Sequence, residues 1–164
     1  MVARRVGEID WTTWRAADRA TLTFVVAGSR MLLIRKKRGL GAGKINAPGG
    51  RLDPGESWQT AAVREMEEEL RVTPLDPVQV GENRFQFLDG YSIHVAIFRA
   101  TVILGEPTET DEATPYWFDL AALPYGEMWE DDRLWVPHVI ANRPFSGRFV
   151  FDGDVMLDHA IELL

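Results

Sequence analysis

The run from Arg64 to Glu69 (Arg-Glu-Met-Glu-Glu-Glu) constrains the fold and chemistry of this chain more than any other feature. Successive residues of a helix turn by about 100°, so Glu65, Glu68 and Glu69 would share one face. A second face is apolar and suits a protein core; it carries Val63, Met66 and Leu70. Like charges at these spacings destabilise an isolated helix. Either bound divalent cations offset that repulsion, or the face is solvated and relieved by neighbouring arginines.

Length and composition limit the class of protein and the kinds of partner. The 164 residues suit one domain with one core, and 46% of them are hydrophobic. The formal net charge of −7 argues against nucleic acid as a partner, whereas a small phosphorylated substrate is compatible if cations reverse the charge locally. No apolar run approaches the roughly 20 residues of a membrane span. There are no cysteines and no apolar leader, so we expect a cytoplasmic protein, and nothing indicates a protein partner.

Hydrophobic patterning predicts an α/β fold. Residues 1–18 read as an N-terminal extension of unknown role, with Trp11 and Trp14 as a packed lead-in or short helix, and residues 19–164 as a single domain. Strands are expected at 21–27, 31–34, 84–88, 93–103 and 116–118, with a hairpin over 149–157. Helices are expected from Ser57, its N-cap, to about 72, and from 131 to 142, separated from the first strands by a glycine-rich loop at 38–50. Alternating strands and two separated helices indicate a sheet with helices on both faces.

The glycine-rich residues before the acidic helix change how its carboxylates are interpreted. The spacing and the residue types of this stretch resemble the Nudix box. Five residues separate Gly50 from Glu56, seven more precede the run from Arg64 to Glu69, and Val72 is the closing apolar residue. One position departs, because Arg71 stands where that family has a glycine that ends the helix in a left-handed conformation. Arginine there would cost about 1 kcal/mol if its φ is positive, but no ligand position is lost.

The Nudix resemblance implies a fold, a cofactor and several roles. The fold would be an α/β/α sandwich with a mixed sheet and two main helices. Mg²⁺, or alternatively Mn²⁺, would be held by Glu65, Glu68 and Glu69, with the Gly49 carbonyl as a further ligand. Arg64 would orient these carboxylates by charge-assisted hydrogen bonds. Water would be activated by Glu65, Glu68 or the distant Glu112. Glu112 is also a candidate metal ligand, although it otherwise reads as an exposed acid in a loop.

Beyond the box, the chain resembles the MutT-homologue type of Nudix hydrolase, which sanitises oxidised purine nucleotides such as 8-oxo-dGTP. The matching segments are Lys36 to Gly43, Trp117-Phe118, and Met128 to Asp132 followed by Trp135 and Pro137. In that family the residues matching Asn46, Asp131 and Asp132 hold the base, and the one matching Trp129 stacks on it. One ionised and one protonated carboxyl can complement a guanine edge, since burial beside a second carboxylate raises one pKa.

Several of these residues have plainer interpretations. Asp131 could be an N-cap, Asp132 a first-turn partner of the helix dipole and Trp129 ordinary core. The remaining candidate substrate contacts have plain interpretations too. Lys36 sits where a phosphate partner would be useful but could be solubilising, and Thr21, Phe85 and Phe87 match pocket positions although strand residues are usually core. The chain also departs from the family at Leu40, Ile45 and Tyr91, so its substrate preference could differ.

The expected activity is Mg²⁺-dependent hydrolysis of an oxidised purine nucleoside triphosphate to the monophosphate and pyrophosphate. The alternative within the family is hydrolysis of ordinary dNTPs or another nucleoside diphosphate derivative. A P-loop over Gly39–Lys44 fails, because the glycine spacing is one residue short and Ile45 replaces the required Ser/Thr. A non-catalytic nucleotide sensor would have lost box glutamates that this chain keeps. The three scattered histidines suggest no zinc site.

Overall fold

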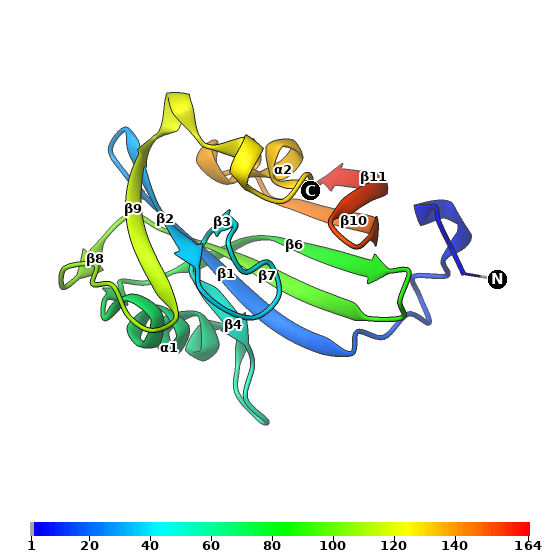
Figure 1. The fold of residues 1–164 in the computed structure, drawn as a ribbon, viewed down its shortest axis with the longest axis horizontal. Coiled ribbons are helices and arrows are strands. Elements are labelled where there is room, and N and C mark those ends of the chain that lie inside the picture. Colours follow the sequence, from blue (N-terminus) through cyan, green and yellow to red (C-terminus); the bar gives the residue numbers. More distant parts are fainter. Residues whose placement is uncertain (1) are drawn as a thin grey trace.

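A mixed β-sheet forms the centre of the protein in a computed structural model that describes residues 2–164 (Figure 1). The strand order is β11-β10-β6-β7-β1-β2-β3, with β4 paired to β1 and β9 to β2. The bounds are β1 Asp18–Ala27, β2 Arg30–Lys36, β3 Ile45–Asn46, β4 Gly49–Arg51, β6 Val78–Phe87, β7 Ser92–Ala100, β9 Ala113–Asp119, β10 Phe145–Asp152 and β11 Val155–Leu163. The β1–β7 and β6–β10 pairs are parallel and the other pairs antiparallel. The expected mixed sheet is confirmed.

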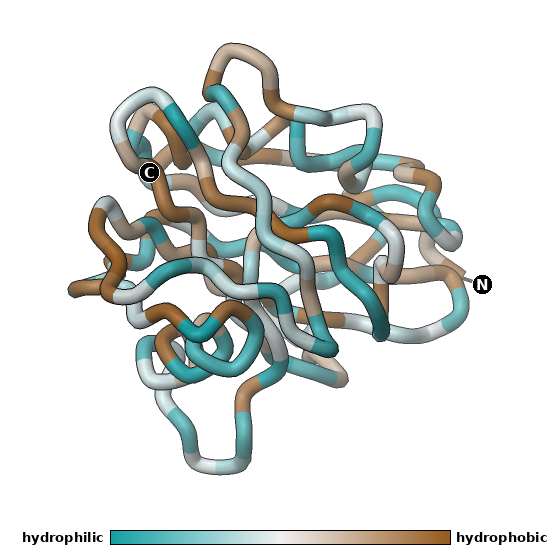
Figure 2. The backbone as a smooth tube through the Cα atoms, turned by 60° about the vertical axis from the view of Figure 1, so that its left-hand side comes forward, coloured by the Kyte–Doolittle hydropathy of each residue, from teal (hydrophilic) through white to brown (hydrophobic). Residues whose placement is uncertain are grey.

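The two main helices lie on opposite faces of this sheet, which Figure 1 shows below and above the strands. Side chains alternate between faces along a strand, and β1 divides its apolar residues accordingly. Phe24 and Val26 pack in one cluster with α2 (Asp132–Ile140), whereas Val25 packs in another with α1 (Trp58–Leu70). In Figure 2 hydrophobic and hydrophilic residues alternate along the helix coils, as expected for helices with one face against the sheet. No helix within residues 2–164 is long and apolar enough to cross a membrane.

Helix α1 begins as predicted and ends on an unusual residue. The Ser57 side chain accepts a hydrogen bond from the Thr60 backbone N–H, which is the expected N-cap. The helix ends at Leu70, two residues before the predicted end. Arg71 then adopts φ 60° and ψ 34°, and its N–H donates to the Glu67 carbonyl. The left-handed geometry that the family's glycine provides is therefore kept here by an arginine.

Other boundaries differ from the sequence-based expectations. The predicted loop at 38–50 contains β3 and the start of β4, which are too short to show a periodic pattern. The predicted strand at 93–103 is wrong as one element, because β7 stops at Ala100 and residues 103–104 form β8, which pairs with β5 (Thr73–Pro74) in a separate two-stranded sheet. Strands β6, β9, β10 and β11 extend beyond their predicted ends, since pairing partners continue the ladder where the sequence pattern fades. Helix α2 tolerates Pro137 within its span.

The N-terminal segment is a packed lead-in rather than an α-helix. Its regular structure is one 3-10 turn at Val6–Glu8. The Val6 N–H donates to Asp158 of β11 at 2.8 Å, and the Trp14 indole donates to Gln86 of β6 at 2.8 Å. These bonds attach the segment to the edge strand β11 and to the inner strand β6.

Candidate active site

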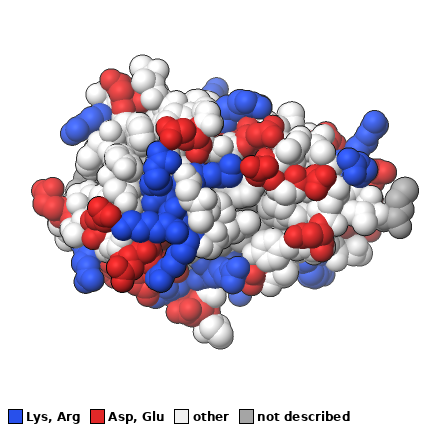
Figure 3. Space-filling view, viewed as in Figure 1, with Lys and Arg blue, Asp and Glu red and all other residues white. Residues whose placement is uncertain are grey.

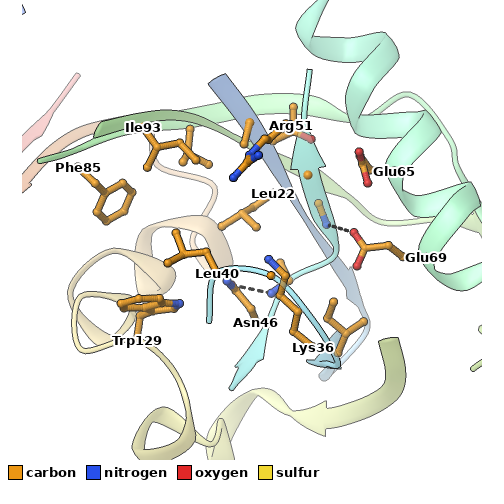
Figure 4. A pocket seen from close by; sticks show the side chains of 18 of the residues that line it. Leu22, Lys36, Leu40, Asn46, Arg51, Glu65, Glu69, Phe85, Ile93 and Trp129 are labelled. Carbon is orange, nitrogen blue, oxygen red and sulfur yellow. Dashed lines mark hydrogen bonds between the residues drawn. The ribbon is translucent and has the colours of Figure 1, made fainter. Parts of the chain in front are cut away.

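One cavity of about 620 Å³ brings together all the residues that the sequence singled out for chemistry and binding. It opens between α1, the start of α2 and the strands β1, β2, β4 and β6. From the metal-binding and catalytic set it is lined by Gly49, Arg64, Glu65, Glu68, Glu69 and Glu112, and from the substrate-binding set by Thr21, Lys36, Asn46, Phe85, Trp129, Asp131 and Asp132. This volume is in the range of small-molecule binding sites. Figure 4 shows the carboxylates at one end and Trp129 and Phe85 at the other.

The acidic end of the cavity holds three carboxylates that face one another. Glu65 and Glu69 project from α1, and Glu112 reaches them from the loop before β9. One oxygen of each lies within 4.8 Å of the others. Glu112 was expected only as a distant candidate, and the turn preceding β9 brings it into the cluster.

Burial and backbone contacts fix the two helix glutamates. Burial, together with repulsion from Glu65 and Glu112, raises the pKa of Glu69 to about 8, although the Gly49 N–H donates to its carboxylate at 2.9 Å. Burial likewise raises the pKa of Glu65. A Cβ at Gly50 would lie 2.4–2.5 Å from the Glu65 carboxyl group, so any larger residue here would displace that carboxylate. The glycines of β4 thus shape the acidic end.

Arg64 is the centre of an ion-pair network beside this cluster. Its guanidinium donates to Glu56 at 2.7 and 2.9 Å and to Glu65 at 2.9 Å. The contact lowers the pKa of Glu56 to about 2. Glu68, expected as a metal ligand, accepts from Arg64 at 3.1 Å with a half-exposed side chain and lies outside the three-carboxylate cluster. Arg64 therefore holds the helix carboxylates to the loop, as its bidentate geometry allows.

Lys36 places a cation between the two ends of the cavity. It is the last residue of β2, and Figure 4 shows it beside Asn46 and below Glu69. Burial lowers its pKa, which the surrounding acids Glu69, Glu65 and Glu112 partly counteract. Lys36 is therefore a half-buried amine facing the acidic cluster, not a solvated surface lysine.

The far end of the cavity carries two buried aspartates, each with one carboxyl oxygen that has no hydrogen-bond partner within the protein. The Trp135 indole donates to Oδ2 of Asp131 at 2.7 Å, while Oδ1 of Asp131 and Oδ2 of Asp132 have no hydrogen-bond partner. Asp131 and Asp132 are 1% and 2% exposed. Burial raises the pKa of Asp131 to about 6, and burial beside Asp131 raises that of Asp132 well above its usual value. Asp131 is the N-cap residue of α2, as the plainer interpretation expected, but its side chain makes no capping hydrogen bond.

Aromatic and amide side chains complete this end. Trp129 meets Phe87 and Phe151 edge to face, and the Lys44 ammonium lies 5.2 Å from its ring centroid. A Cβ at Gly41 would lie 2.8 Å from the Trp129 indole nitrogen, so the glycine loop packs directly on this ring. The Asn46 side-chain carbonyl accepts from the Ala47 N–H at 2.8 Å, which leaves its NH₂ group available as a donor.

The residues that depart from the family pattern are placed differently. Leu40 lies in the cavity wall and is 45% exposed, and Tyr91 lines it while its hydroxyl donates to Asp18 at 2.9 Å. Ile45 is fully buried in the core and is not part of the wall. Thr21 belongs to the wall but is fully buried, with its hydroxyl unpaired.

Sequence reasoning missed several wall residues. Leu22, Ile93 and Arg51 line the cavity (Figure 4). Trp135 donates a hydrogen bond to Asp131 in its wall. The apolar strand residues carry no local signal, since core and pocket positions look alike in a strand. Trp135 could have been found, because Asp131 and Trp135 are four residues apart at the start of a helix.

Comparison with known proteins identifies the family. The NUDIX domain matches residues 17–139, most of the chain. The chain belongs to the Nudix family. Two curated relatives carry the name "Oxidized purine nucleoside triphosphate hydrolase": one from Danio rerio is 42% identical, covering 87% of this chain and 92% of its own, and one from Mus musculus is 37% identical, covering 86% and 92%. The protein is therefore a Nudix hydrolase.

Solved structures support the fold of this Nudix hydrolase. A MutT protein from Bacillus halodurans superposes with a TM-score of 0.80 at 27% identity, covering 88% of this chain and 97% of that one. A MutT NUDIX hydrolase from Burkholderia pseudomallei gives 0.67 at 28% identity, covering 74% and 97%. The predicted Nudix fold with a mixed sheet and two helices is confirmed.

The Nudix metal requirement fits the donor set found here. Nudix hydrolases use divalent metal ions, and the Glu65, Glu69 and Glu112 oxygens are the hard ligands that Mg²⁺ and Mn²⁺ prefer. Two of these glutamates are buried, and burial of carboxylates so close together is unfavourable without a cation.

Proposed function

We propose that this Nudix hydrolase cleaves oxidised purine nucleoside triphosphates to the monophosphate and pyrophosphate with Mg²⁺. The observation that carries the proposal is the pair of unpaired, buried oxygens on Asp131 and Asp132 in the cavity wall. Buried polar atoms are costly without partners, so a ligand with donors and acceptors along one edge is needed to complete them. A flat purine edge meets that need.

The protonation states of the two aspartates suit an oxidised guanine. Burial raises the pKa of both carboxyls, and the neighbouring Asp131 also raises that of Asp132, which favours a pair that shares one proton, held on Asp132. Asp131 then accepts hydrogen bonds from the base, and Asp132 also donates one. The NH₂ group of Asn46 supplies a further donor, and the Trp129 ring a surface for stacking. The relatives named as oxidised purine nucleoside triphosphate hydrolases support this assignment.

At the opposite end, Glu65, Glu69 and Glu112 would hold Mg²⁺, with Glu68 and the Gly49 carbonyl as further ligands. The bound ion neutralises phosphate charge and lowers the pKa of water. Arg64 keeps Glu65 and Glu68 in place through its hydrogen bonds. Lys36 lies where it can contact a phosphate oxygen, and Glu65, Glu68 and Glu112 are the candidates for accepting the proton of the attacking water.

The test is pyrophosphate release with Mg²⁺ from 8-oxo-dGTP, 2-hydroxy-dATP, dGTP and dATP in parallel. We expect a strong preference for an oxidised purine and loss of turnover in Glu69→Gln. Equal slow turnover of all four nucleotides would keep the hydrolase chemistry but reject the oxidised-purine preference, and would favour ordinary dNTPs or another nucleoside diphosphate derivative.

A second arm tests the base end alone. Asp132→Ala removes the buried carboxyl and is expected to lower kcat/KM for the preferred oxidised purine by about 10- to 100-fold. Asp132→Asn keeps a donor and is expected to retain more activity. Asp152→Asn, at the exposed end of β10, is the control for a lost aspartate. If Asp132→Ala leaves the KM of every nucleotide unchanged, the assignment of this end to the base is wrong.

A further inference from the structure

A second cavity of about 520 Å³ lies between the N-terminal segment and the loop of the Nudix box. One wall comes from residues 11–19 and the other from residues 51–54, and the floor comes from β6 and β7. Its lining residues are Trp11, Trp14, Arg15, Ala16, Ala17, Asp18, Arg19, Arg51, Leu52, Asp53, Pro54, Arg84 and His94. Residues 11–16 precede the matched NUDIX domain, the other lining residues lie within it, and the proposed activity assigns this cleft no role.

The charge of this cleft is opposite to that of the protein. Four arginines and two aspartates line it, whereas the chain carries a net charge of −7. Arg84 is neutralised by Glu82 at 2.7 Å, and Glu82 also contacts His94 at 2.9 Å. The excess positive charge therefore comes from the other three arginines, which outnumber the two lining aspartates, whereas positive and negative side chains are interspersed on the face that Figure 3 draws.

The arginines near the mouth of the cleft have spare hydrogen-bonding capacity. Within residues 2–164, neither Arg15 nor Arg19 forms an ion pair with a carboxylate: Arg15 donates to the backbone carbonyls of Thr12 and Trp14, and Arg19 lies over the Trp58 ring at 5.5 Å. Arg51 makes one longer contact, 3.4 Å to Asp18, and its side chain is 66% exposed. Guanidinium groups held this way present free N–H donors that suit phosphate oxygens.

The cleft also adjoins the catalytic cavity. Arg51 and Asp53 line both spaces, on the side of the catalytic cavity where the Nudix box lies. The indoles of Trp11 and Trp14, whose ring centroids are 5.2 Å apart, form an aromatic wall beside the arginines. Hydrogen bonds from Trp14 to Gln86 and from Trp11 to Val6 hold both rings in place.

We propose that this cleft is a second anion site, in which Arg15, Arg19 and Arg51 bind a phosphate or diphosphate group. Two sources offer that chemistry: pyrophosphate, and the phosphate of a second nucleotide whose base rests against the tryptophans. The N-terminal segment is then a ligand-binding element of the protein, since it supplies Arg15 and both indoles.

The test measures binding without turnover, by calorimetry on the full chain in buffer freed of divalent metal. Without metal, the catalytic carboxylates repel phosphate groups, and the comparison of arginine variants then assigns the remaining anion binding to the cleft. The ligands are inorganic pyrophosphate, AMP and adenosine. The variant Arg15→Gln with Arg19→Gln is compared with Arg4→Gln with Arg5→Gln, which removes the same charge from exposed positions of the same segment outside the cleft.

We expect pyrophosphate or AMP to bind wild type. The affinity should fall about tenfold in the Arg15/Arg19 variant and stay unchanged in the Arg4/Arg5 control. Arg15→Lys with Arg19→Lys keeps both charges and should restore part of the affinity. Tighter binding of pyrophosphate identifies the product as the ligand, and tighter binding of AMP a second nucleotide. Three outcomes would overturn the proposal. In the first, adenosine and AMP bind with equal affinity while pyrophosphate does not bind; in the second, all variants bind the anions equally. In the third, neither anion binds wild type at about 10 mM. Because the binding measurement needs no catalysis, absence of anion binding would leave the proposed hydrolase function untouched. Absence of the hydrolase activity would likewise leave the anion site untouched.

Discussion

The indole Nε1 of Trp135 donates a 2.7 Å hydrogen bond to Oδ2 of Asp131, one helical turn earlier on the same buried surface. The bond uses one carboxylate oxygen and leaves Oδ1 without a partner in the cavity wall. Trp135 is itself fixed by an edge contact with Phe24 and a stacked contact with Phe145. The core of the sheet therefore orients a residue of the proposed base site.

Trp135→Phe tests this positioning role. The change removes the indole donor, so Asp131 is left less well oriented, and we expect a higher KM for the oxidised purine with little change in kcat. The free energy of unfolding should also fall by about 1–3 kcal/mol, because a buried acceptor loses its partner and a small void opens. Steady-state kinetics and urea denaturation measure the two effects. Trp117→Phe, on β9 away from the cavity, is the control, and an unchanged KM in Trp135→Phe would contradict the positioning role.

The aspartate pair should make stability depend on pH. Burial raises the pKa of Asp131 to about 6 and that of Asp132 well above normal, so the folded protein binds protons that the unfolded chain releases. Their contribution to stability is fully present below about pH 4 and is lost as pH rises through the folded pKa values. We expect Asp132→Asn to reduce the fall in unfolding free energy above pH 4, measured by urea denaturation in EDTA. The same slope in wild type and variant would contradict the raised pKa of Asp132.

Gly50→Ala should disable the acidic end without altering the fold. The added Cβ would lie 2.4–2.5 Å from the Glu65 carboxyl group, so this carboxylate must move away from Glu69 and Glu112. We expect activity or Mg²⁺ affinity to fall by about 10- to 100-fold, as when a supporting contact of a metal site is lost. Measuring the rate as a function of Mg²⁺ concentration separates a loss of metal affinity from a loss of activity at saturating metal. Gly126→Ala, where a Cβ meets nothing within 4 Å, should behave as wild type.

Arg71→Gly should stabilise the protein. Arg71 has φ 60° at the end of α1, a conformation that costs a non-glycine residue about 1 kcal/mol. Part of the gain is offset by the greater freedom of glycine in the unfolded chain, so thermal or urea denaturation should show a rise of up to about 1 kcal/mol. Arg71→Ala removes the side chain but keeps the strained φ. Equal stability of the Gly and Ala variants would show that φ is not the cause.

The metal end could be predicted from the sequence because its information is local. Glycine spacing, a helix period and the cluster of glutamates on one face identify Glu65, Glu69 and Arg64 within one continuous stretch of chain. The Ser57 cap and the helical course of α1 follow from the same short-range rules, and they agree with the structure.

Contacts between distant segments were decided only by the tertiary structure. The carboxylate of Glu112 joins Glu65 and Glu69 because β9 pairs with β2 and carries its preceding loop over α1, which no local pattern encodes. The cleft beside Arg15 and Arg19 likewise exists only because the N-terminal segment bonds to β6 and β11. The raised pKa values of Asp131 and Asp132 arise from burial under the folded sheet and α2, and burial is a property of packing rather than of residue order.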